Sequence, residues 1–337
     1  MPQTRISKDS ICAVVGYGSW ATAIVKILLE NGSTVRWHVR NPEVKAHLTA
    51  HRTNPKYLSQ VHFFTDRLQV SDDIRSVVRD SDVIIFAVPS AFLGLTLEPL
   101  DRRALDGKFI VSAIKGIVPD GYVTVAEWLN QRYGVPFDRI GIVTGPCHAE
   151  EVALERLSYL TMVCKDPATA DLLGEKFAND YIRVTISADI YGAEYAAVLK
   201  NIYAIAVGIA HGLGYGDNFL AVLISNAALE MERFLSSTFD AERNVCNSAY
   251  LGDLLVTCYS QFSRNRTFGV MIGKGYSVRN AQMEMNMVAE GYYAADCIHR
   301  LQSRFGIDMP IAEAVYGILY ERKSPVDQLK GILDRLR

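Results

Sequence analysis

Near the N-terminus the sequence reads Ile11-Cys12-Ala13-Val14-Val15-Gly16-Tyr17-Gly18-Ser19-Trp20-Ala21. The first five residues form an apolar run of strand length, and a G-x-G-x-x-A turn follows them directly. A helical pattern then covers residues 22–30, Asn31-Gly32 ends it, and residues 34–39 have the pattern of a second strand. In such a βαβ unit the glycines let the backbone approach a pyrophosphate, and the helix amides face its charge. The sequence therefore predicts a Rossmann-type dinucleotide-binding domain, with a purely structural glycine turn as the alternative.

The end of the second strand bears on the choice of nicotinamide cofactor. In NAD-binding domains this strand is followed by an Asp or Glu that holds the ribose hydroxyls. Here the sequence is His38-Val39-Arg40-Asn41, without an acid. Arg40 could accept the 2′-phosphate of NADP, or it could stack on the adenine ring. We therefore predict NAD(H) or NADP(H) as the cofactor, with tolerance of NADP(H).

Further apolar runs of strand length follow in the first half of the chain. The runs cover residues 82–88, 109–114, 140–144, 159–164 and 181–186. The first three of them end in loops at the carboxyl end of the strand, where an open α/β sheet binds its ligands. From about residue 190 only helical patterns follow, at 191–210, 218–235, 251–259, 277–283, 293–305 and 311–320. The predicted fold class is α/β, with a Rossmann-type NAD(P)-binding domain over residues 1–189 and an all-helical substrate domain over residues 190–337.

Composition narrows the class of protein. Of 337 residues, 49% are apolar and 21% are charged, and the net charge of -2 gives no basic surface for nucleic acid. No apolar run approaches the roughly 18 residues of a membrane span, and the N-terminus lacks the apolar core of a signal peptide. The six cysteines and seven histidines show no metal or redox spacing. We expect a cytoplasmic protein with no metal and no membrane anchor.

A lysine lies in the middle of the longest apolar helical pattern. Residues 191–210 are apolar nearly all round, which predicts a buried core helix, and they contain Lys200 and Asn201. A buried ammonium group needs partners or loses its proton. Lys200 is therefore a candidate for binding an anion or for moving a proton. The alternative is a lysine whose stem is buried while its charge reaches the surface.

Other polar residues accompany this lysine in the helical half. Asp253 lies at a helix start with Thr257 one turn later on the same face, although Asp253 could simply be an N-cap. Arg264 and Asn265 offer donors suited to phosphate oxygens, or they belong to a solvated loop. In the first half, Lys115 follows a strand end, where a cation suits a phosphate or a carbonyl oxygen; the alternative is an exposed loop lysine.

Together these segments resemble NAD(P)-dependent glycerol-3-phosphate dehydrogenase over nearly the whole chain. No single stretch is decisive, but the order and spacing of the stretches are highly specific. The matching stretches are Gly16–Ala23, Phe86–Ser90, Ser112–Gly116, Gly145-Pro146, Ala149–Ala153, Leu199–Asn201, His211–Asn218, Leu251–Leu254, Ser263–Arg266, Gly273–Gly275 and Ala289–Gly291.

The resemblance implies a reaction and a mechanism. Dihydroxyacetone phosphate would lie between the domains with its C2 carbonyl facing the nicotinamide, and reduction would give sn-glycerol 3-phosphate for glycerophospholipid synthesis. Lys200 would stabilise the carbonyl oxygen and deliver the proton, and it would act as the base in the oxidative direction. Asp253 and Thr257 would orient Lys200, and Lys115 would add positive charge near the substrate.

The resemblance also implies two sets of binding residues. The substrate set is Lys115, Gly145, Cys147, Lys200, Asn201, Asp253, Ser263, Arg264 and Asn265. The cofactor set is Gly16, Gly18, Ser19, Trp20, His38, Arg40, Tyr57, Lys115, Ala149, Arg264, Val288 and Glu290.

The sequence departs from the family pattern in four places, each of one to three residues. Cys147 replaces a usual serine, and a thiol is a poorer hydrogen-bond donor than a hydroxyl. His148 stands where an aromatic residue is common, Tyr195-Ala196 replaces a small glycine pair, and Ser248-Ala249-Tyr250 replaces a glycine-rich lead. These changes bear on substrate geometry and rate, and they leave the main charged groups in place.

Two other functions remain open from the sequence. One is a reductase of the same architecture, like ketopantoate reductase or 6-phosphogluconate dehydrogenase, acting on another phosphorylated or carboxylated keto compound. The other is a non-catalytic nicotinamide-binding redox sensor, which would not need Lys200, Asp253, Thr257 and Arg264 together. The expected partner is a small-molecule substrate, and the helical half has enough apolar surface for a homodimer.

Overall fold

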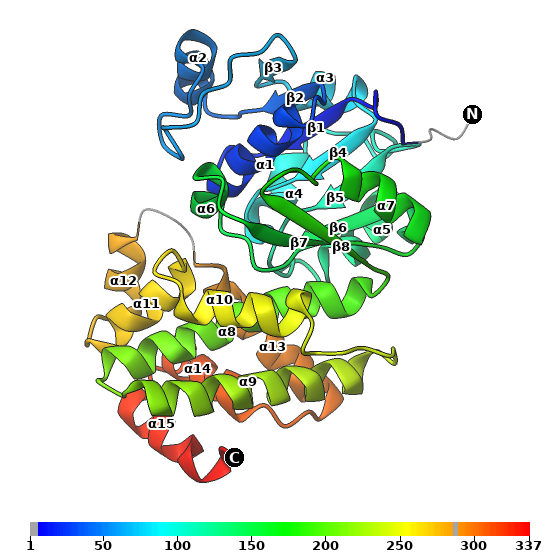
Figure 1. Cartoon of the computed structure of the whole chain (residues 1–337). Helices are drawn as coiled ribbons and strands as arrows, with labels where there is room; N and C mark the ends of the chain where they lie inside the picture. Colours follow the sequence, from blue (N-terminus) through cyan, green and yellow to red (C-terminus); the bar gives the residue numbers. More distant parts are fainter. Residues whose placement is uncertain (1–5, 286–288) are drawn as a thin grey trace. The chain divides into compact units, whose positions relative to one another are not determined.

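The computed structural model describes residues 6–285 and 289–337, which divide into two compact units (Figure 1). Unit 1 holds the described residues up to Ile114 together with Val125–Ile190. Unit 2 holds Lys115–Thr124 and Tyr191–Arg337. The sequence predicts domains over residues 1–189 and 190–337. In the structure the short segment Lys115–Thr124, which lies within the first of these ranges, belongs to the helical unit instead.

Unit 1 is built on one eight-stranded sheet with the strand order β3-β2-β1-β4-β5-β6-β7-β8. All neighbouring strands are parallel except β6 and β7, which run antiparallel. The sheet confirms the predicted α/β class and adds β3, a strand that the sequence pattern did not indicate. The strands are β1 Cys12–Val15, β2 Val35–His38, β3 Leu68–Ser71, β4 Val83–Phe86, β5 Phe109–Ser112, β6 Ile140–Thr144, β7 Ser158–Cys164 and β8 Ile182–Ser187.

Helices connect these strands. The first of them begins at Ser19, directly after the glycine turn, and its apolar residues lie in the buried core that includes β1 and β2. The strands β1 and β4 are buried along their whole length, as parallel strands covered on both faces are. The helices are α1 Ser19–Glu30, α2 Pro42–His51, α3 Ile74–Arg79, α4 Leu93–Leu97, α5 Val125–Tyr133, α6 Ala149–Ala153 and α7 Pro167–Glu175.

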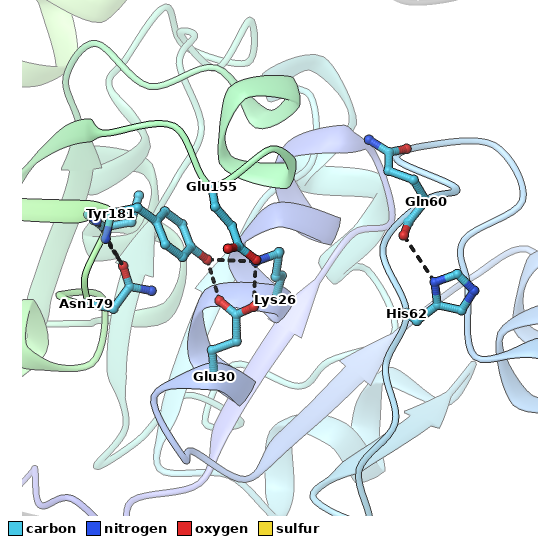
Figure 2. Close-up of polar contacts among 8 residues, drawn as sticks. Lys26, Glu30, Gln60, His62, Glu155, Asn179 and Tyr181 are labelled. Atoms are coloured by element: carbon cyan, nitrogen blue, oxygen red, sulfur yellow. Dashed lines mark hydrogen bonds and ion pairs between the residues drawn. The ribbon is translucent and has the colours of Figure 1, made fainter.

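A buried lysine ties α1 to two distant segments of unit 1 (Figure 2). Lys26 is only 8% exposed, and its Nζ lies 2.5 Å from Glu30, 3.1 Å from Glu155 and 2.9 Å from the Tyr181 hydroxyl. Tyr181 also donates to Glu30. Glu155 follows α6 and Tyr181 precedes β8, so one ammonium group joins three parts of the chain.

Lys26→Met is expected to lower the free energy of unfolding by about 2 kcal/mol, because it leaves Glu30 and Glu155 without their shared cation. Urea unfolding measures this loss. Lys45→Met is the matched control: it removes an exposed ion pair with Asp72 and should cost less than about 0.5 kcal/mol. Equal losses in the two variants would show that the contacts of Lys26 contribute no more than a surface pair.

Unit 2 is helical and is organised around α8, Ile190–Gly212. This helix is long and apolar enough to cross a membrane by composition, but its apolar window is completely buried within the protein, as in a core helix. The other helices are α9 Asp217–Thr238, α10 Asp253–Tyr259, α11 Arg264–Gly273, α12 Val278–Glu284, α13 Glu290–Phe305, α14 Pro310–Tyr320 and α15 Pro325–Ile332. The sequence pattern did not indicate α11 or α15.

The segment 115–124 is held by unit 2 through several kinds of contact. The main-chain oxygen of Lys115 accepts a hydrogen bond from Asn201 on α8 at 2.8 Å. Ile117 is buried in the helical core. The guanidinium of Arg300 on α13 lies 5.0 Å from the centre of the Tyr122 ring, a distance suited to a cation–π contact.

Glycines bring α8 and α11 into backbone contact. An added Cβ at Gly208 on α8 would lie 2.2 Å from the main-chain oxygen of Arg266, and one at Gly269 on α11 would lie 2.2 Å from that of Ile205. Gly212 and Gly273 repeat the contact one turn later, at 2.5 and 2.3 Å. Because no side chain separates the two helices here, their spacing is set by the main chain.

Candidate active site

Lys200 is the centre of a buried polar cluster in unit 2. It is 4% exposed, and its Nζ donates to Asp253 Oδ1 at 2.6 Å and to Thr257 Oγ1 at 3.0 Å. The lysine comes from α8 and its two partners come from α10. The ammonium group is therefore bonded inside the unit, and the alternative of a lysine that reaches the surface is wrong for Lys200.

The chain before α10 places the two partners. Residues Ser248–Gly252 form one π-helical turn, a widened form of helix that is frequent at functional sites. Asp253 begins α10 directly after this turn, and Thr257 follows one helical turn later. The Thr257 hydroxyl donates to the main-chain oxygen of Asp253 at 2.6 Å. Its hydrogen is thereby used, and its lone pairs are left to accept from Lys200.

A second lysine shares the same carboxylate. Lys115 Nζ lies 3.3 Å from Asp253 Oδ2, and its side chain is 20% exposed against 2% for that of Asp253. The structure thus brings together Lys115, Lys200, Asp253 and Thr257, the four residues that the resemblance implies as catalytic. The alternative of a merely exposed loop lysine is wrong for Lys115.

Burial and charge set the protonation of this cluster. The pKa of Lys200 is lowered to about 8: burial is the largest cause, the negative charge of Asp253 acts in the opposite direction, and the positive charge of Lys115 acts in the same direction as burial. Burial alone would raise the pKa of Asp253, but Lys115 and Lys200 outweigh it and the pKa is lowered. Lys200 can therefore give up or take back a proton near neutral pH, as a general acid–base group must.

Two buried asparagines connect this cluster to the neighbouring helices. Asn201 Nδ2 donates to the main-chain oxygen of Lys115 at 2.8 Å, and Asn265 Nδ2 donates to Asn201 Oδ1 at 2.8 Å. The main-chain N–H of Gly291 on α13 donates to Asn265 Oδ1 at 2.9 Å. Within the described residues each Nδ2 donates one hydrogen bond, which leaves its second hydrogen for a ligand oxygen.

The predicted phosphate-binding residues stand at the start of a helix. The alternative of a solvated loop for Arg264 and Asn265 is wrong, because both residues belong to α11, which Ser263 caps by accepting from the main-chain N–H of Arg266 at 3.3 Å. Arg264, the first residue of α11, is exposed, while Asn265 is buried. Glu290 is the first residue of α13, and Val288 lies outside the described residues.

The remaining predicted residues lie in unit 1. Gly16, Gly18, Ser19 and Trp20 form the glycine turn and the start of α1, and His38 is the last residue of β2. Burial lowers the pKa of His38, which favours the neutral imidazole. Arg40 is exposed and Tyr57 is half-buried. Gly145, Cys147 and Ala149 follow β6, with φ +109° at Gly145 and a buried Cys147 side chain.

The glycine turn fits a dinucleotide pyrophosphate. Gly16 has φ +120°, and an added Cβ would lie 2.4 Å from the main-chain oxygen of Ala87, so only glycine fits there. An added Cβ at Gly18 meets nothing within 4 Å. Among the described residues no side chain caps the N-terminus of α1, and its first turn holds no acid. A helix N-terminus without an acid or a side-chain cap is suited to an anion.

Two residues outside this turn, which the sequence pattern did not single out, donate hydrogen bonds to it. Trp37 Nε1 donates to the main-chain oxygen of Gly16 at 2.6 Å, and Asn54 Nδ2 donates to that of Tyr17 at 2.9 Å. Trp37 reads as one more apolar residue of β2, and Asn54 stands before Pro55 in a loop. Neither position carries a periodic signal that could have revealed its partner.

Comparisons with known proteins cover both units. The family model described as "NAD-dependent glycerol-3-phosphate dehydrogenase N-terminus" matches residues 11–170, and the corresponding C-terminus model matches residues 189–330. The glycerol-3-phosphate dehydrogenase [NAD(P)+] of Prosthecochloris aestuarii is 37% identical over 326 residues, covering 96% of this chain and 98% of that protein. The one from Chlorobium limicola is 39% identical over 325 residues, 96% of each chain.

Solved structures agree in fold. The crystal structure of glycerol-3-phosphate dehydrogenase from Coxiella burnetii has a TM-score of 0.90 and 29% identity, covering 98% of this chain and 100% of that one. A putative ketopantoate reductase from Ralstonia solanacearum has a TM-score of 0.59 and 14% identity, covering 96% of this chain and 99% of that one. The second likeness shows a shared fold alone.

Proposed function

Because this chain belongs to the NAD-dependent glycerol-3-phosphate dehydrogenase family, we propose that it interconverts dihydroxyacetone phosphate and sn-glycerol 3-phosphate with NAD(H) or NADP(H). The observation that carries the proposal is the buried Lys200, bonded to Asp253 and Thr257. Many oxidoreductases and sensors have a dinucleotide-binding fold. Binding a dinucleotide does not require a buried lysine of this kind, whereas proton transfer to the substrate requires an acid–base group such as Lys200.

Lys200 is the proton donor of the reduction. The reduced nicotinamide, when bound, supplies a hydride to C2 of the substrate. Negative charge then develops on the C2 oxygen, and the Lys200 ammonium stabilises that charge and passes a proton to the oxygen. In the oxidative direction the neutral amine takes the hydroxyl proton. Asp253 and Thr257 accept hydrogen bonds from Nζ and so fix its position in both directions.

The phosphate group is bound by residues near this cluster. Lys115 contributes a second positive charge, and the exposed Arg264 presents a guanidinium group at the start of α11. Asn201 and Asn265 each offer their second N–H to the substrate. Ser263 contributes indirectly, because its hydroxyl caps α11. Gly145 and Cys147 complete the proposed substrate set, and the weaker donor at Cys147 bears on rate.

The glycine turn, Ser19, Trp20, His38, Tyr57, Ala149 and Glu290 hold the cofactor in this proposal. Arg40 follows β2 where an acid would select NAD, and its exposed guanidinium is suited to the 2′-phosphate of NADP. The enzyme should therefore use NADPH as well as NADH. We place it in the cytoplasm, as a homodimer without a membrane anchor, supplying sn-glycerol 3-phosphate to glycerophospholipid synthesis.

The test is oxidation of NADH and NADPH, followed by absorbance, with three substrates: dihydroxyacetone phosphate, unphosphorylated dihydroxyacetone and ketopantoate. Turnover with the phosphate ester alone is the expected result and supports both the reaction and the Arg264 site. Turnover on ketopantoate instead would favour the rival reductase. Cofactor binding without turnover on any keto compound would favour the redox sensor. Exclusive use of NADH would overturn the expectation for Arg40.

The pH dependence should differ between the two directions. Reduction needs the Lys200 ammonium, so its kcat should fall as the pH rises through about 8, the pKa of Lys200. Oxidation needs the neutral amine and should rise over the same interval. Lys115→Met removes a positive charge that lowers this pKa, so both limbs should move to higher pH. Profiles of kcat in both directions measure these shifts, and limbs that stay in place in Lys115→Met would contradict the assignment.

A further inference from the structure

Side chains donate hydrogen bonds to the main-chain oxygens of Gly16, Tyr17 and Gly18, the three residues of the glycine turn that precede α1. The main-chain oxygen of Gly16 accepts from Trp37 Nε1 at 2.6 Å, that of Tyr17 accepts from Asn54 Nδ2 at 2.9 Å, and that of Gly18 accepts from Thr22 Oγ1 at 2.9 Å. The three donors belong to completely buried residues. These carbonyl groups are thereby fixed towards the interior, and their partial negative charge is kept from an anion at the helix N-terminus.

Asn54 is the centre of this arrangement. Its Nδ2 donates to the Tyr17 oxygen and to Thr22 Oγ1, both at 2.9 Å. Its Oδ1 accepts from the main-chain N–H groups of Lys56 and Tyr57, at 3.0 and 3.3 Å. An amide side chain has two donor hydrogens and two acceptor sites, so Asn54 uses all four. It joins the glycine turn, helix α1 and the segment that carries Tyr57.

We propose that Asn54 is a positioning residue for the dinucleotide cofactor, holding the glycine turn and the Lys56–Tyr57 segment in the cofactor-binding arrangement before the cofactor binds. The inference rests on the cofactor site of the proposed function. A turn that is ordered during folding does not have to be ordered during binding, and this raises the affinity. Asn54 touches the turn through its carbonyl groups, so its effect on the cofactor is indirect.

The test is the dissociation constant of the full-length Asn54→Ala protein for NADH and for ADP-ribose, measured by calorimetry. ADP-ribose carries the pyrophosphate but no nicotinamide, so it reports on the glycine turn. Loss of one or two hydrogen bonds that order the turn should raise both constants about tenfold or more. The KM for NADH should rise accordingly, while kcat at saturating NADH and the KM for dihydroxyacetone phosphate should stay unchanged.

Asn31→Ala is the matched control. Asn31 follows the opposite end of α1, and its Nδ2 also donates to two main-chain oxygens, those of Lys176 and Ala178 at 2.9 and 3.0 Å. This variant should have a lower Tm than the wild type but the same dissociation constants for NADH and ADP-ribose. Thr22→Val is the second test variant, because it keeps the side-chain shape while removing the hydroxyl that binds Asn54 and the Gly18 oxygen. It decides the matter if Asn54→Ala does not fold.

Two results would overturn the inference. One is binding of both ligands within about twofold of the wild type in Asn54→Ala, or in Thr22→Val if the first variant does not fold. The other is equal weakening in Asn31→Ala, which would reveal general destabilisation of unit 1. A wild-type protein that binds neither ligand would instead refute the cofactor assignment itself, and the inference with it.

Discussion

Lys200→Met is expected to lower kcat for reduction of dihydroxyacetone phosphate by about 10²–10⁴-fold, the usual contribution of a general acid–base group. Methionine has a similar length and no charge, so it fills the buried space on α8. The Asp253 carboxylate keeps Lys115 as a cationic partner at 3.3 Å, which limits the cost to folding. Steady-state kinetics measure kcat, and the dissociation constant of NADH should stay that of the wild type because the glycine turn is untouched.

Two further variants separate charge from proton transfer at this position. Lys200→Arg keeps a positive charge but cannot release a proton near neutral pH, so its kcat should stay low. Lys274→Met makes the same substitution at an exposed lysine that follows α11, and it should behave as the wild type. A Lys200→Met protein with nearly normal kcat would remove Lys200 from the mechanism.

Gly269→Ala should destabilise the protein by about 3 kcal/mol, at the upper end of overpacking losses. The new Cβ would lie 2.2 Å from the Ile205 oxygen and 2.9 Å from the Ile209 nitrogen, both in the main chain of α8. A buried helix backbone cannot move aside as the end of a flexible side chain can. Separation of α8 from α11 would also loosen the bond between Asn201 and Asn265.

Gly331→Ala supplies the opposite case for the same substitution. Gly331 lies in α15, and an added Cβ there meets nothing within 4 Å. Alanine should therefore raise the free energy of unfolding by about 0.5–1 kcal/mol through its helix propensity. Urea unfolding of both variants measures the two effects. Similar small changes in the two proteins would mean that α8 and α11 do not depend on backbone contact.

Strong local patterns made much of the fold predictable. The strand, glycine turn and helix of residues 11–30 form as expected, because apolar periodicity and glycine position act within a few residues. The four-residue strand β3 was missed because its run Leu-Gln-Val-Ser is short and half polar. Helix α11 was missed because Arg264-Asn265-Arg266 is typical of a loop, and only the Ser263 cap marks a helix start.

The candidate site was predictable where burial alone raised the question. Lys200 stands out because an ammonium group in an apolar helix needs hydrogen-bond partners. In the structure these partners are Asp253 and Thr257. The contact between Asn201 and the Lys115 main chain was not predictable, because it joins residues 86 positions apart. The partners of Asn54 likewise depend on how a loop folds back onto the glycine turn.

Because residues 115–124 belong to the helical unit, they affect how chimeras of this enzyme and its relatives should be designed. The chain passes between the units at 114/115, 124/125 and 190/191. A chimera joined only near residue 190 would combine the helices of one parent with the Lys115–Thr124 segment of the other. Asn201, the core around Ile117 and the carboxylate shared by two lysines would then come from mismatched sequences. A functional chimera needs all three junctions, so that this segment is inherited with its helices.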